Sequence, residues 1–252
     1  MAKVVGFTAL LYGKDYLAWA IRSIIDHIDE YHIAYSPIGA HGHRTEIPCP
    51  ETREELYAIA SAAAGNKLHW HDGEWAHEGL QRDSIHEYAP DADVIVVLDA
   101  DEIWHSELIQ WAVNPLDGTG ETRGQRIRIG MIHYWRSFYR AVIHDPACPV
   151  RVIYPKIKPS EGCLDSRHIK QVISHLGYAQ RPEIVQYKQL THGHRNEWRK
   201  DVDWFADKYM ANAQTDCHPV GSEYWNPERV DPLDYMPRWM MEHPYYHMQV
   251  IE

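Results

Sequence analysis

Three carboxylates follow the most apolar stretch of the chain. Residues 94–98 are all aliphatic, and Asp99, Asp101 and Glu102 come directly after them. Carboxylates at the end of a buried strand repel one another and lose solvation unless a cation or a shared proton compensates them. Oxygen ligands favour hard cations such as Mg²⁺ or Mn²⁺, and these ions bind phosphates. The segment therefore predicts a site for a divalent cation and a phosphate-bearing ligand, with a solvated acidic turn as the alternative.

The elements that would position these carboxylates alternate between strand and helix patterns. Strand patterns lie at 4–11, 31–35, 67–71 and 94–98, and helix patterns lie at 17–28, 52–64 and 74–89. Asp15 is expected to cap the first helix, and Thr52 with Glu55 forms a capping-box signature at the second. Alternation of this kind predicts a doubly wound α/β sheet, in which ligands bind beyond the carboxyl ends of the strands.

The pattern changes in the second half of the chain. Strand patterns at 125–131, 150–154 and 172–174 are mixed with helix patterns at 182–190 and 201–213. Prolines at 219, 227, 232, 237 and 244 exclude a long helix there. No linker or repeat separates the halves, so we expect a single domain over 1–252, with a sheet-based half at 1–115 and an irregular half at 116–252.

Composition excludes several classes of protein. With 25 Lys and Arg against 36 Asp and Glu, the formal charge is −11, which argues against a general nucleic-acid coat protein. The four cysteines form no CxxC pair, so a thiolate zinc site is not expected. No run reaches the ~18 apolar residues of a membrane span, and no signal-peptide pattern opens the chain. These features predict a cytoplasmic protein without an integral membrane segment.

The first half resembles a glycosyltransferase of the GT-A fold, close to the family 2 type. The resemblance covers about residues 4–112 and rests on the first strand, the turn after it, a helix with a serine near Ser23, the pair Arg82-Asp83, and the run from Ala92 to Glu102. It implies a Rossmann-like fold with a mostly parallel central sheet flanked by helices. In that family the Asp-x-Asp motif holds a divalent ion against the diphosphate of a nucleotide-sugar donor. By resemblance Asp101 ligates the metal and Asp99 faces the metal or the ribose, while the donor contacts are Thr8, Asp15 and Arg82.

The second half carries a looser similarity to the same fold, over 173–178 and 183–194. In several GT-A enzymes a histidine in such a segment completes the metal shell. The resemblance implies His175 as that ligand, with His192 or His194 as alternatives, and an imidazole ligand favours Mn²⁺ over Mg²⁺. The candidates for phosphate contact in this half are Arg151, Lys188 and Arg195.

The implied activity is transfer of a sugar from a nucleoside diphosphate to a hydroxyl acceptor, with a glycan or lipid-linked saccharide as the expected acceptor. The catalytic base stays open between Asp145, Glu161 and Asp165, and the identity of the nucleotide base is open because no carboxylate follows the second strand pattern. Trp104, Tyr134 and Trp135 are candidates for a sugar platform or for core packing.

Two other functions remain open. One is a glycosyltransferase that acts on hydroxymethylated bases in DNA. The other is a non-catalytic metal- or carbohydrate-binding protein, because pairs such as His41-x-His43, His69-x-His71 and His192-x-His194 also occur in metal-binding barrels.

Overall fold

The larger of two β-sheets is built around the strands expected from the first half of the chain. A computed structural model describes residues 2–39, 45–114, 126–146, 148–156, 163–165, 172–192, 195–221 and 225–252. Within these residues β1 (Val4–Leu10), β2 (Glu30–Tyr35), β3 (Leu68–Asp72) and β4 (Val94–Val97) run parallel, in the spatial order β3-β2-β1-β4. Each parallel step crosses over through helical segments, as βαβ units require.

Among the described strands the sheet as a whole is mixed, with four parallel and two antiparallel pairings, so the expected α/β class is confirmed and a mostly parallel, Rossmann-like sheet is not. Strands from the second half extend it beyond β4: β9 (Val150–Ile153), β6 (Arg126–Arg128) and β10 (Cys163–Asp165). β9 runs antiparallel to both β4 and β6, whereas β10 runs parallel to β6. The reversal arises because β9 approaches the edge of β4 from the opposite direction instead of through a crossover helix. The structure is therefore a mixed α/β fold.

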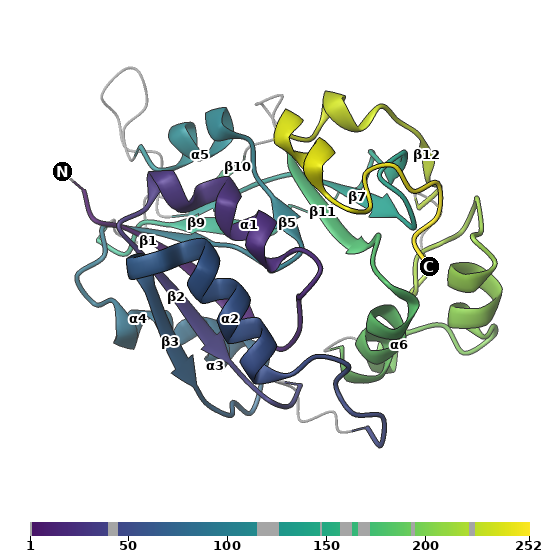
Figure 1. Ribbon diagram of the computed structural model, residues 1–252, viewed down its shortest axis with the longest axis horizontal. Helices are drawn as coiled ribbons and strands as arrows, with labels where there is room; N and C mark the ends of the chain where they lie inside the picture. Colours follow the sequence, from purple (N-terminus) through teal and green to yellow (C-terminus); the bar gives the residue numbers. More distant parts are fainter. Residues whose placement is uncertain are drawn as a thin grey trace.

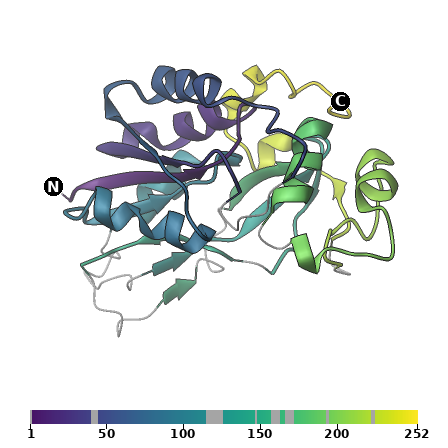
Figure 2. The same ribbon diagram turned by 90° about the horizontal axis from the view of Figure 1, so that it is seen from below.

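Helices cover both faces of the larger sheet (Figure 1, Figure 2). α1 (Leu17–Ile24) and α2 (Arg53–Ala64) pack on one face, while α3 (Glu78–Asp83) and α4 (Ile85–Tyr88) lie on the other. Every residue of β4 is buried, with Val94 and Val96 in the core beneath α1 and Ile95 and Val97 in the core beneath α4. The prediction of a strand buried on both faces is confirmed.

The two predicted helix caps have opposite outcomes. At α2 the Glu55 N–H donates to Thr52 Oγ1 over 3.2 Å and the Thr52 N–H donates to Glu55 Oε2 over 3.0 Å, so the capping box is confirmed. The predicted cap of α1 by Asp15 is wrong, because Tyr16 occupies the N-cap position without a side-chain hydrogen bond. Asp15 instead accepts hydrogen bonds from Arg181 Nε at 3.0 and 3.1 Å.

The acidic segment is the place where the chain passes from the larger sheet to the smaller one. β5 (Glu102–Ile103) starts a few residues after β4 and joins a second sheet with β12 (Glu228–Arg229), β8 (Arg140–Val142), β7 (Met131–Trp135) and β11 (Ile173–Tyr178), in the order β12-β8-β7-β11-β5. Glu102 pairs with His175 across β5 and β11, and His175 pairs with His133 across β11 and β7. Both halves of the chain thus contribute strands to both sheets.

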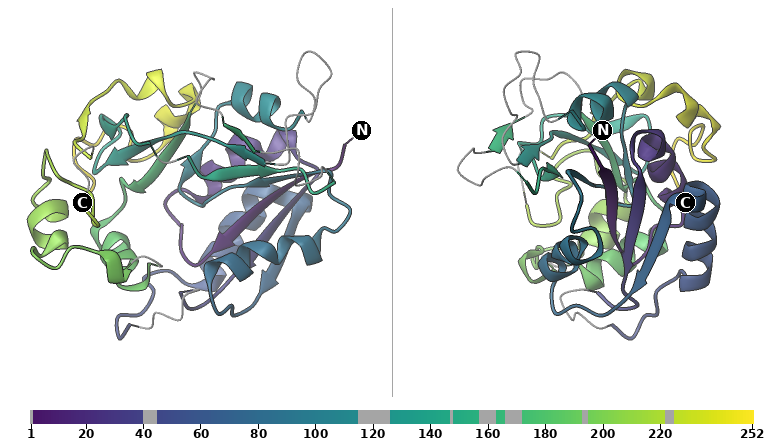
Figure 3. Two further views of the ribbon diagram at one scale, coloured as in Figure 1. Left: turned by 180° about the vertical axis from the view of Figure 1, so that it is seen from behind. Right: turned by 90° about the vertical axis from the view of Figure 1, so that its left-hand side faces the viewer.

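The remaining helices surround the smaller sheet. α5 (Ser106–Ala112) follows β5, α6 (Pro182–Thr191) follows β11, and residues Trp204–Met210 form a π-helix. His105 holds the N-cap position of α5 without a side-chain hydrogen bond. The proline-rich C-terminal segment lies against α1 (Figure 3). Trp239 of this segment stacks on Trp19 of α1, with ring centroids 6.0 Å apart. In the described residues no helix is long and apolar enough to cross a bilayer.

Candidate functional site

A cavity of about 680 Å³ lies at the carboxyl ends of β1 and β4, beside the step between the two sheets. This is the edge at which open α/β sheets bind ligands. Its titratable lining residues are Glu78, Arg82, Asp99, Asp101, His133, Asp145, Arg151, His175, Lys188, His192 and His218. Its neutral polar and aromatic lining includes Tyr12, Tyr178, Gln180 and Trp225. A lining this rich in opposite charges suits a charged, polar ligand.

Arginines compensate two of the three carboxylates of the acidic segment. Asp99 Oδ1 contacts Arg82 at 2.7 Å and Asp99 Oδ2 contacts Arg151 at 2.6 Å. Glu102 is fully buried and receives Arg151 at 2.5 to 3.1 Å through both of its oxygens. Since guanidinium groups occupy both oxygens of Asp99, this side chain holds an ion-pair position and not the expected metal-facing one. The expected compensation of the carboxylates is thus supplied at Asp99 and Glu102 by arginine side chains.

Burial and the arginines move the pKa values of these carboxyls in opposite directions. Burial would raise the pKa of Asp99, but Arg151 and Arg82 outweigh it and hold that pKa well below its usual range. Glu102 lies deeper, and burial raises its pKa to about 7 even beside Arg151. Asp99 is therefore ionised at physiological pH and holds the two guanidinium groups at the cavity wall.

Asp101 makes a different set of contacts. Its Oδ1 lies 3.6 Å from His175 Nε2, and its Oδ2 lies 3.1 Å from Gln180 Nε2 and 3.7 Å from Lys188 Nζ. The side chains of Asp101, His175 and Lys188 are 14, 15 and 10% exposed, so they face the cavity rather than bulk water. A carboxylate and an imidazole nitrogen thus point toward each other beside an ammonium group.

Two histidines extend this arrangement to a second carboxylate. The parallel pairing of β7 and β11 places His133 Nδ1 2.8 Å from His175 Nδ1. His133 Nε2 lies 3.3 Å from Asp145 Oδ2, which also accepts a hydrogen bond from Trp225 Nε1 at 2.7 Å. The result is a chain of four side chains across the cavity: Asp145, His133, His175 and Asp101.

Both imidazoles of this chain are neutral over the physiological pH range. Burial lowers the pKa of His133 to about 3, and the neighbouring His175 adds to the effect. Burial likewise lowers the pKa of His175 to about 3, assisted by Lys188. Neutral imidazoles can accept or donate hydrogen bonds and can ligate metal ions.

Acid should destabilise the protein through these two histidines. Below the usual histidine pKa of about 6.5, His133 and His175 bind protons in the unfolded chain but stay neutral in the native state. The free energy of unfolding therefore falls as the pH falls toward 3. At pH 5 each buried histidine should contribute a loss of about 2 kcal/mol. Urea unfolding at pH 7 and pH 5 measures this difference, and the double variant His133→Gln/His175→Gln should show a smaller one. Equal pH dependence in both proteins would contradict the assignment.

The cavity brings together eight of the residues that the sequence nominated: Arg82, Asp99, Asp101, Asp145, Arg151, His175, Lys188 and His192. Three others lie elsewhere. Thr8 is buried inside the larger sheet, where its hydroxyl donates to the Leu98 carbonyl oxygen. Asp15 pairs with Arg181, and Arg195 is exposed and donates to the Leu190 carbonyl oxygen.

Three further candidates fall on residues whose side chains the structure does not describe. Glu161 and His194 lie outside the described residues. Asp165 ends β10, at the outer edge of the larger sheet, and only its backbone is described. Among the three carboxylates proposed as a base, Asp145 is therefore the one with a described position in the cavity.

Of the two roles left open for Trp104, Tyr134 and Trp135, a sugar platform or core packing, core packing is confirmed. Trp104, Tyr134 and Trp135 are fully buried and belong to the hydrophobic cores. Their bulk supports the smaller sheet and leaves no face for a ligand. An aromatic wall is supplied instead by Trp225, which packs against His133 and His218 with ring centroids 4.9 and 4.7 Å apart.

Sequence reasoning missed several residues that build the site. His133, Gln180, His218 and Trp225 belong to no local motif and meet only through the smaller sheet and the loops around it. Glu51 also escaped notice: its Oε2 accepts the backbone N–H groups of Gly13 and Lys14 at 2.7 and 2.8 Å, which shapes the turn at the cavity rim. The sequence signal that pointed to these residues was the high number of histidines, 18 in the chain, and this number does not indicate which of them lie close together.

Comparison with known proteins adds no assignment: neither the protein-family models nor the curated proteins contain a match to this chain. Any functional conclusion must come from the site itself.

Proposed function

We propose that this protein is a metal-dependent glycosyltransferase that binds a nucleoside-diphosphate sugar in the cavity and transfers the sugar to a hydroxyl acceptor. The observation that carries the proposal is the pairing of Asp101 with His175 beside Lys188, Arg82 and Arg151 at the carboxyl ends of β1 and β4. The parallel order β3-β2-β1-β4 is the arrangement expected of the donor-binding half of a GT-A fold, which we propose as the finer description.

Asp101 and His175 fit a divalent cation, whereas Asp99 does not. The Asp101 oxygen and the His175 nitrogen lie 3.6 Å apart, close to the about 3.0–3.4 Å that separates two ligands on one ion at usual bond lengths. His175 is neutral, so its nitrogen is able to ligate. One carboxylate oxygen and one imidazole suit Mn²⁺ or Mg²⁺, with Mn²⁺ favoured. Such an ion neutralises the charge that develops on a departing diphosphate.

Three cations of the chain suit the diphosphate itself. Arg82 and Arg151 are oriented by Asp99, and Lys188 is held near the Gly177 carbonyl oxygen and over the Tyr178 ring. Planar guanidinium groups bind phosphate oxygens in pairs, whereas a lysine acts as a point charge. Because all three line one cavity, they offer positive charge to the phosphates while Asp101 offers negative charge to the cation.

Asp145 is the proposed base toward the acceptor. It lies in the cavity wall, at the end of the histidine chain opposite Asp101. A carboxylate placed there can take the proton of an attacking hydroxyl while it also stabilises positive charge at the anomeric carbon. Trp225 donates to Asp145 Oδ2 and fixes the orientation of the carboxylate.

The acceptor that we propose is a saccharide. The chain carries a formal charge of −11, which disfavours a polyanion such as DNA as partner, and Trp225 offers an aromatic surface in the cavity wall. Hydroxymethylated DNA would be supported instead if duplex binding were found that weakens steeply with salt.

A thermal-shift panel of nucleoside diphosphates with and without Mn²⁺ tests the proposal. We expect at least one nucleotide to raise the melting temperature only when Mn²⁺ is present, and the corresponding nucleotide sugar to be hydrolysed slowly. A binding protein without catalysis would leave the sugar nucleotide intact. Nucleotide-induced shifts that ignore the metal would refute the site.

Adding a methyl group at Gly177 should disturb this site while the fold is retained. A Cβ there would lie 2.5 Å from His175 Cε1 and 2.8 Å from Lys188 Nζ, so both side chains must shift. We expect Gly177→Ala to weaken Mn²⁺-dependent nucleotide binding by at least about tenfold, since even supporting groups of metal sites have effects of this size. Titration of the nucleotide by calorimetry measures it.

Gly130→Ala is the matched control. Its Cβ would meet the nearest neighbour, Val172 Cγ1, at 3.7 Å, an ordinary contact. Equal nucleotide affinity of the two variants would argue against a role for His175 and Lys188.

A further inference from the structure

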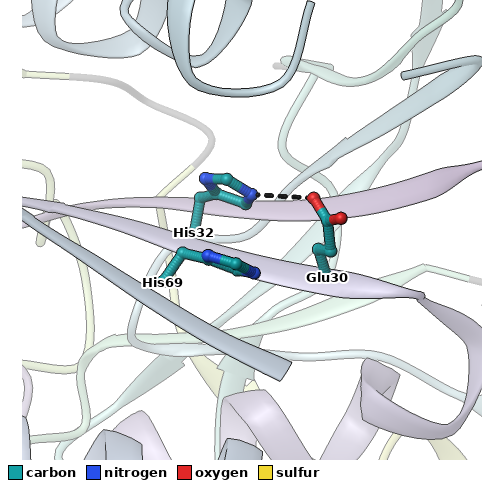
Figure 4. Close-up of side chains that lie close together, drawn as sticks. All are labelled: Glu30, His32 and His69. Carbon is teal, nitrogen blue, oxygen red and sulfur yellow. Dashed lines mark hydrogen bonds and ion pairs between the residues drawn. The ribbon is translucent and has the colours of Figure 1, made fainter. Parts of the chain in front are cut away.

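A second cluster of metal-ligand side chains lies on the larger sheet, away from the cavity. Glu30 and His32 are two residues apart on β2 and therefore point to the same face, and His69 is the register partner of His32 on β3. Figure 4 shows the Glu30 carboxylate beside His32 and the His69 ring stacked on His32. The ligand atoms of Glu30, His32 and His69 all lie within 4.8 Å of one another. The cluster is on the face that carries α4, near the start of β2, whereas the cavity lies beyond the opposite ends of the strands.

We propose that Glu30, His32 and His69 bind a Zn²⁺ ion that links β2 to β3. Two imidazoles and one carboxylate are a set that zinc prefers, with its further positions left to water. Because β3 is the last strand of the larger sheet, such a link would fasten an edge strand to its neighbour. The inference does not depend on the proposed glycosyltransferase activity.

The two inner ligands already have the supporting contacts that metal ligands require. Glu30 Oε2 lies 3.2 Å from His32 Nε2, while the other oxygen, Oε1, is held by Lys3 Nζ at 2.8 Å. On the far side of its ring, His32 Nδ1 lies 3.0 Å from His71 Nε2. A ligating histidine typically donates its second N–H to a fixed partner, which sets the tautomer and orients the ring. Here His71 supplies that partner, and it is itself stacked on Tyr88 with ring centroids 3.7 Å apart.

Protonation and charge also favour a cation. His32 is only 3% exposed, and burial lowers its pKa, so the imidazole is neutral at physiological pH. Lys3 contacts Asp91 at 3.0 Å as well as Glu30, so it can stay paired when the charge of Glu30 is shared with a metal ion. When an ion binds at His32 Nε2, the ring proton lies on Nδ1, and this N–H donates to His71 Nε2.

His69 is the adjustable member. Its ring is exposed and stacks on His32, with centroids 4.5 Å apart and planes inclined by 15°. Ligands of one Zn²⁺ ion lie about 3.3 Å apart at usual bond lengths, so the ring must turn toward the other two ligands. Exposed side chains make such rotations at little cost.

Calorimetric titration with Zn²⁺ tests the site in the wild type and in the variants His69→Ala and Glu30→Gln. Each protein is also made with the substitution Asp101→Asn, which removes the metal contact proposed in the cavity. We expect each substitution to weaken this Zn²⁺ binding at least about tenfold, while His86→Ala, which removes an exposed histidine on α4, leaves it unchanged. His71→Ala should weaken it about 10- to 100-fold through the lost partner of His32.

A Co²⁺ titration of the unmodified chain tests the site without any substitution, so its result does not depend on whether a variant folds. Visible absorption bands typical of a four- or five-coordinate Co²⁺ ion with nitrogen ligands are expected, and Zn²⁺ should displace them. The proposal is overturned if Zn²⁺ does not bind, or if its affinity survives either His69→Ala or Glu30→Gln. The two proposals can be judged separately in Asp101→Asn. This variant should lose nucleotide binding in the cavity but keep Zn²⁺ binding at Glu30, His32 and His69, so a failure at one site leaves the test of the other unaffected.

Discussion

Asp101→Asn should abolish the Mn²⁺-dependent nucleotide shift and lower sugar transfer by roughly 100-fold or more, beyond the 10- to 100-fold effects of groups that merely support a metal ligand. The substitution keeps the shape of the side chain and removes the one carboxylate that lies between His175 and Lys188. The amide can still bond to Gln180, so the fold should persist with a melting temperature close to that of the wild type. Nucleotide titration with and without Mn²⁺, together with a transfer assay, measures the effect.

Asp83→Asn is the control for the loss of one negative charge near the site. Asp83 is exposed on α3 and does not line the cavity, so its variant should bind nucleotide and metal like the wild type. If Asp101→Asn retained full metal dependence, the metal would have to be held by other groups and the proposed site would be wrong. If both variants lost binding equally, a general charge effect would explain the result.

Arg151→Met should cost about 3–5 kcal/mol of unfolding free energy, the penalty expected when one partner of a buried ion pair is removed. Arg151 is 7% exposed and is shared between Asp99 and Glu102. Asp99 keeps Arg82, but Glu102 is completely buried and would lose the arginine that contacts both of its oxygens. Urea unfolding at pH 7 with two independent probes measures the cost.

The double variant Arg151→Met/Glu102→Gln shows how much of the lost unfolding free energy comes from leaving the Glu102 carboxyl without its arginine and how much comes from lost packing. Removing the buried carboxyl should recover about 0.5–3 kcal/mol, the usual coupling energy between residues in one network. The cost of Arg151→Met should also grow between pH 5 and pH 8, mainly above about pH 7, because Glu102 of the wild type ionises there beside Arg151 whereas the buried carboxyl of the variant keeps its proton while the unfolded chain releases it. A cost that is the same at both pH values and in the Glu102→Gln background would show that packing, not charge, holds Arg151 in place.

Sequence patterns were informative where the determining interactions are local. The aliphatic run of β4 shows burial on both faces directly, because adjacent side chains of a strand point to opposite sides. The capping box at Thr52 and Glu55 needs only residues three apart, and it formed as expected. The order of strands and helices along the first half follows from the same local periodicities, although the split of the expected helix at 74–89 into α3 and α4 does not.

The sequence could not determine which charged residues form ion pairs when they lie far apart in the chain. Local reasoning treats Asp99, Asp101 and Glu102 as one acidic cluster, yet Arg151 reaches the first and last of them from β9, a strand that joins the sheet from the other half of the chain. The carboxylates do lie close together, but the arginine that compensates them, Arg151, is 49 residues from Glu102 and 52 residues from Asp99 in the chain.

The chain by itself determined that carboxylates stand at the end of a buried strand in an α/β protein, since that depends on neighbouring residues alone. Only the tertiary structure decided that Asp101 meets His175 while Asp99 meets two arginines, and that His133 lies beside His175. These meetings depend on the register of β5, β7 and β11, and a shift of one residue would turn every side chain of a strand to the other face. Register is settled by packing over the whole sheet, which no local pattern records.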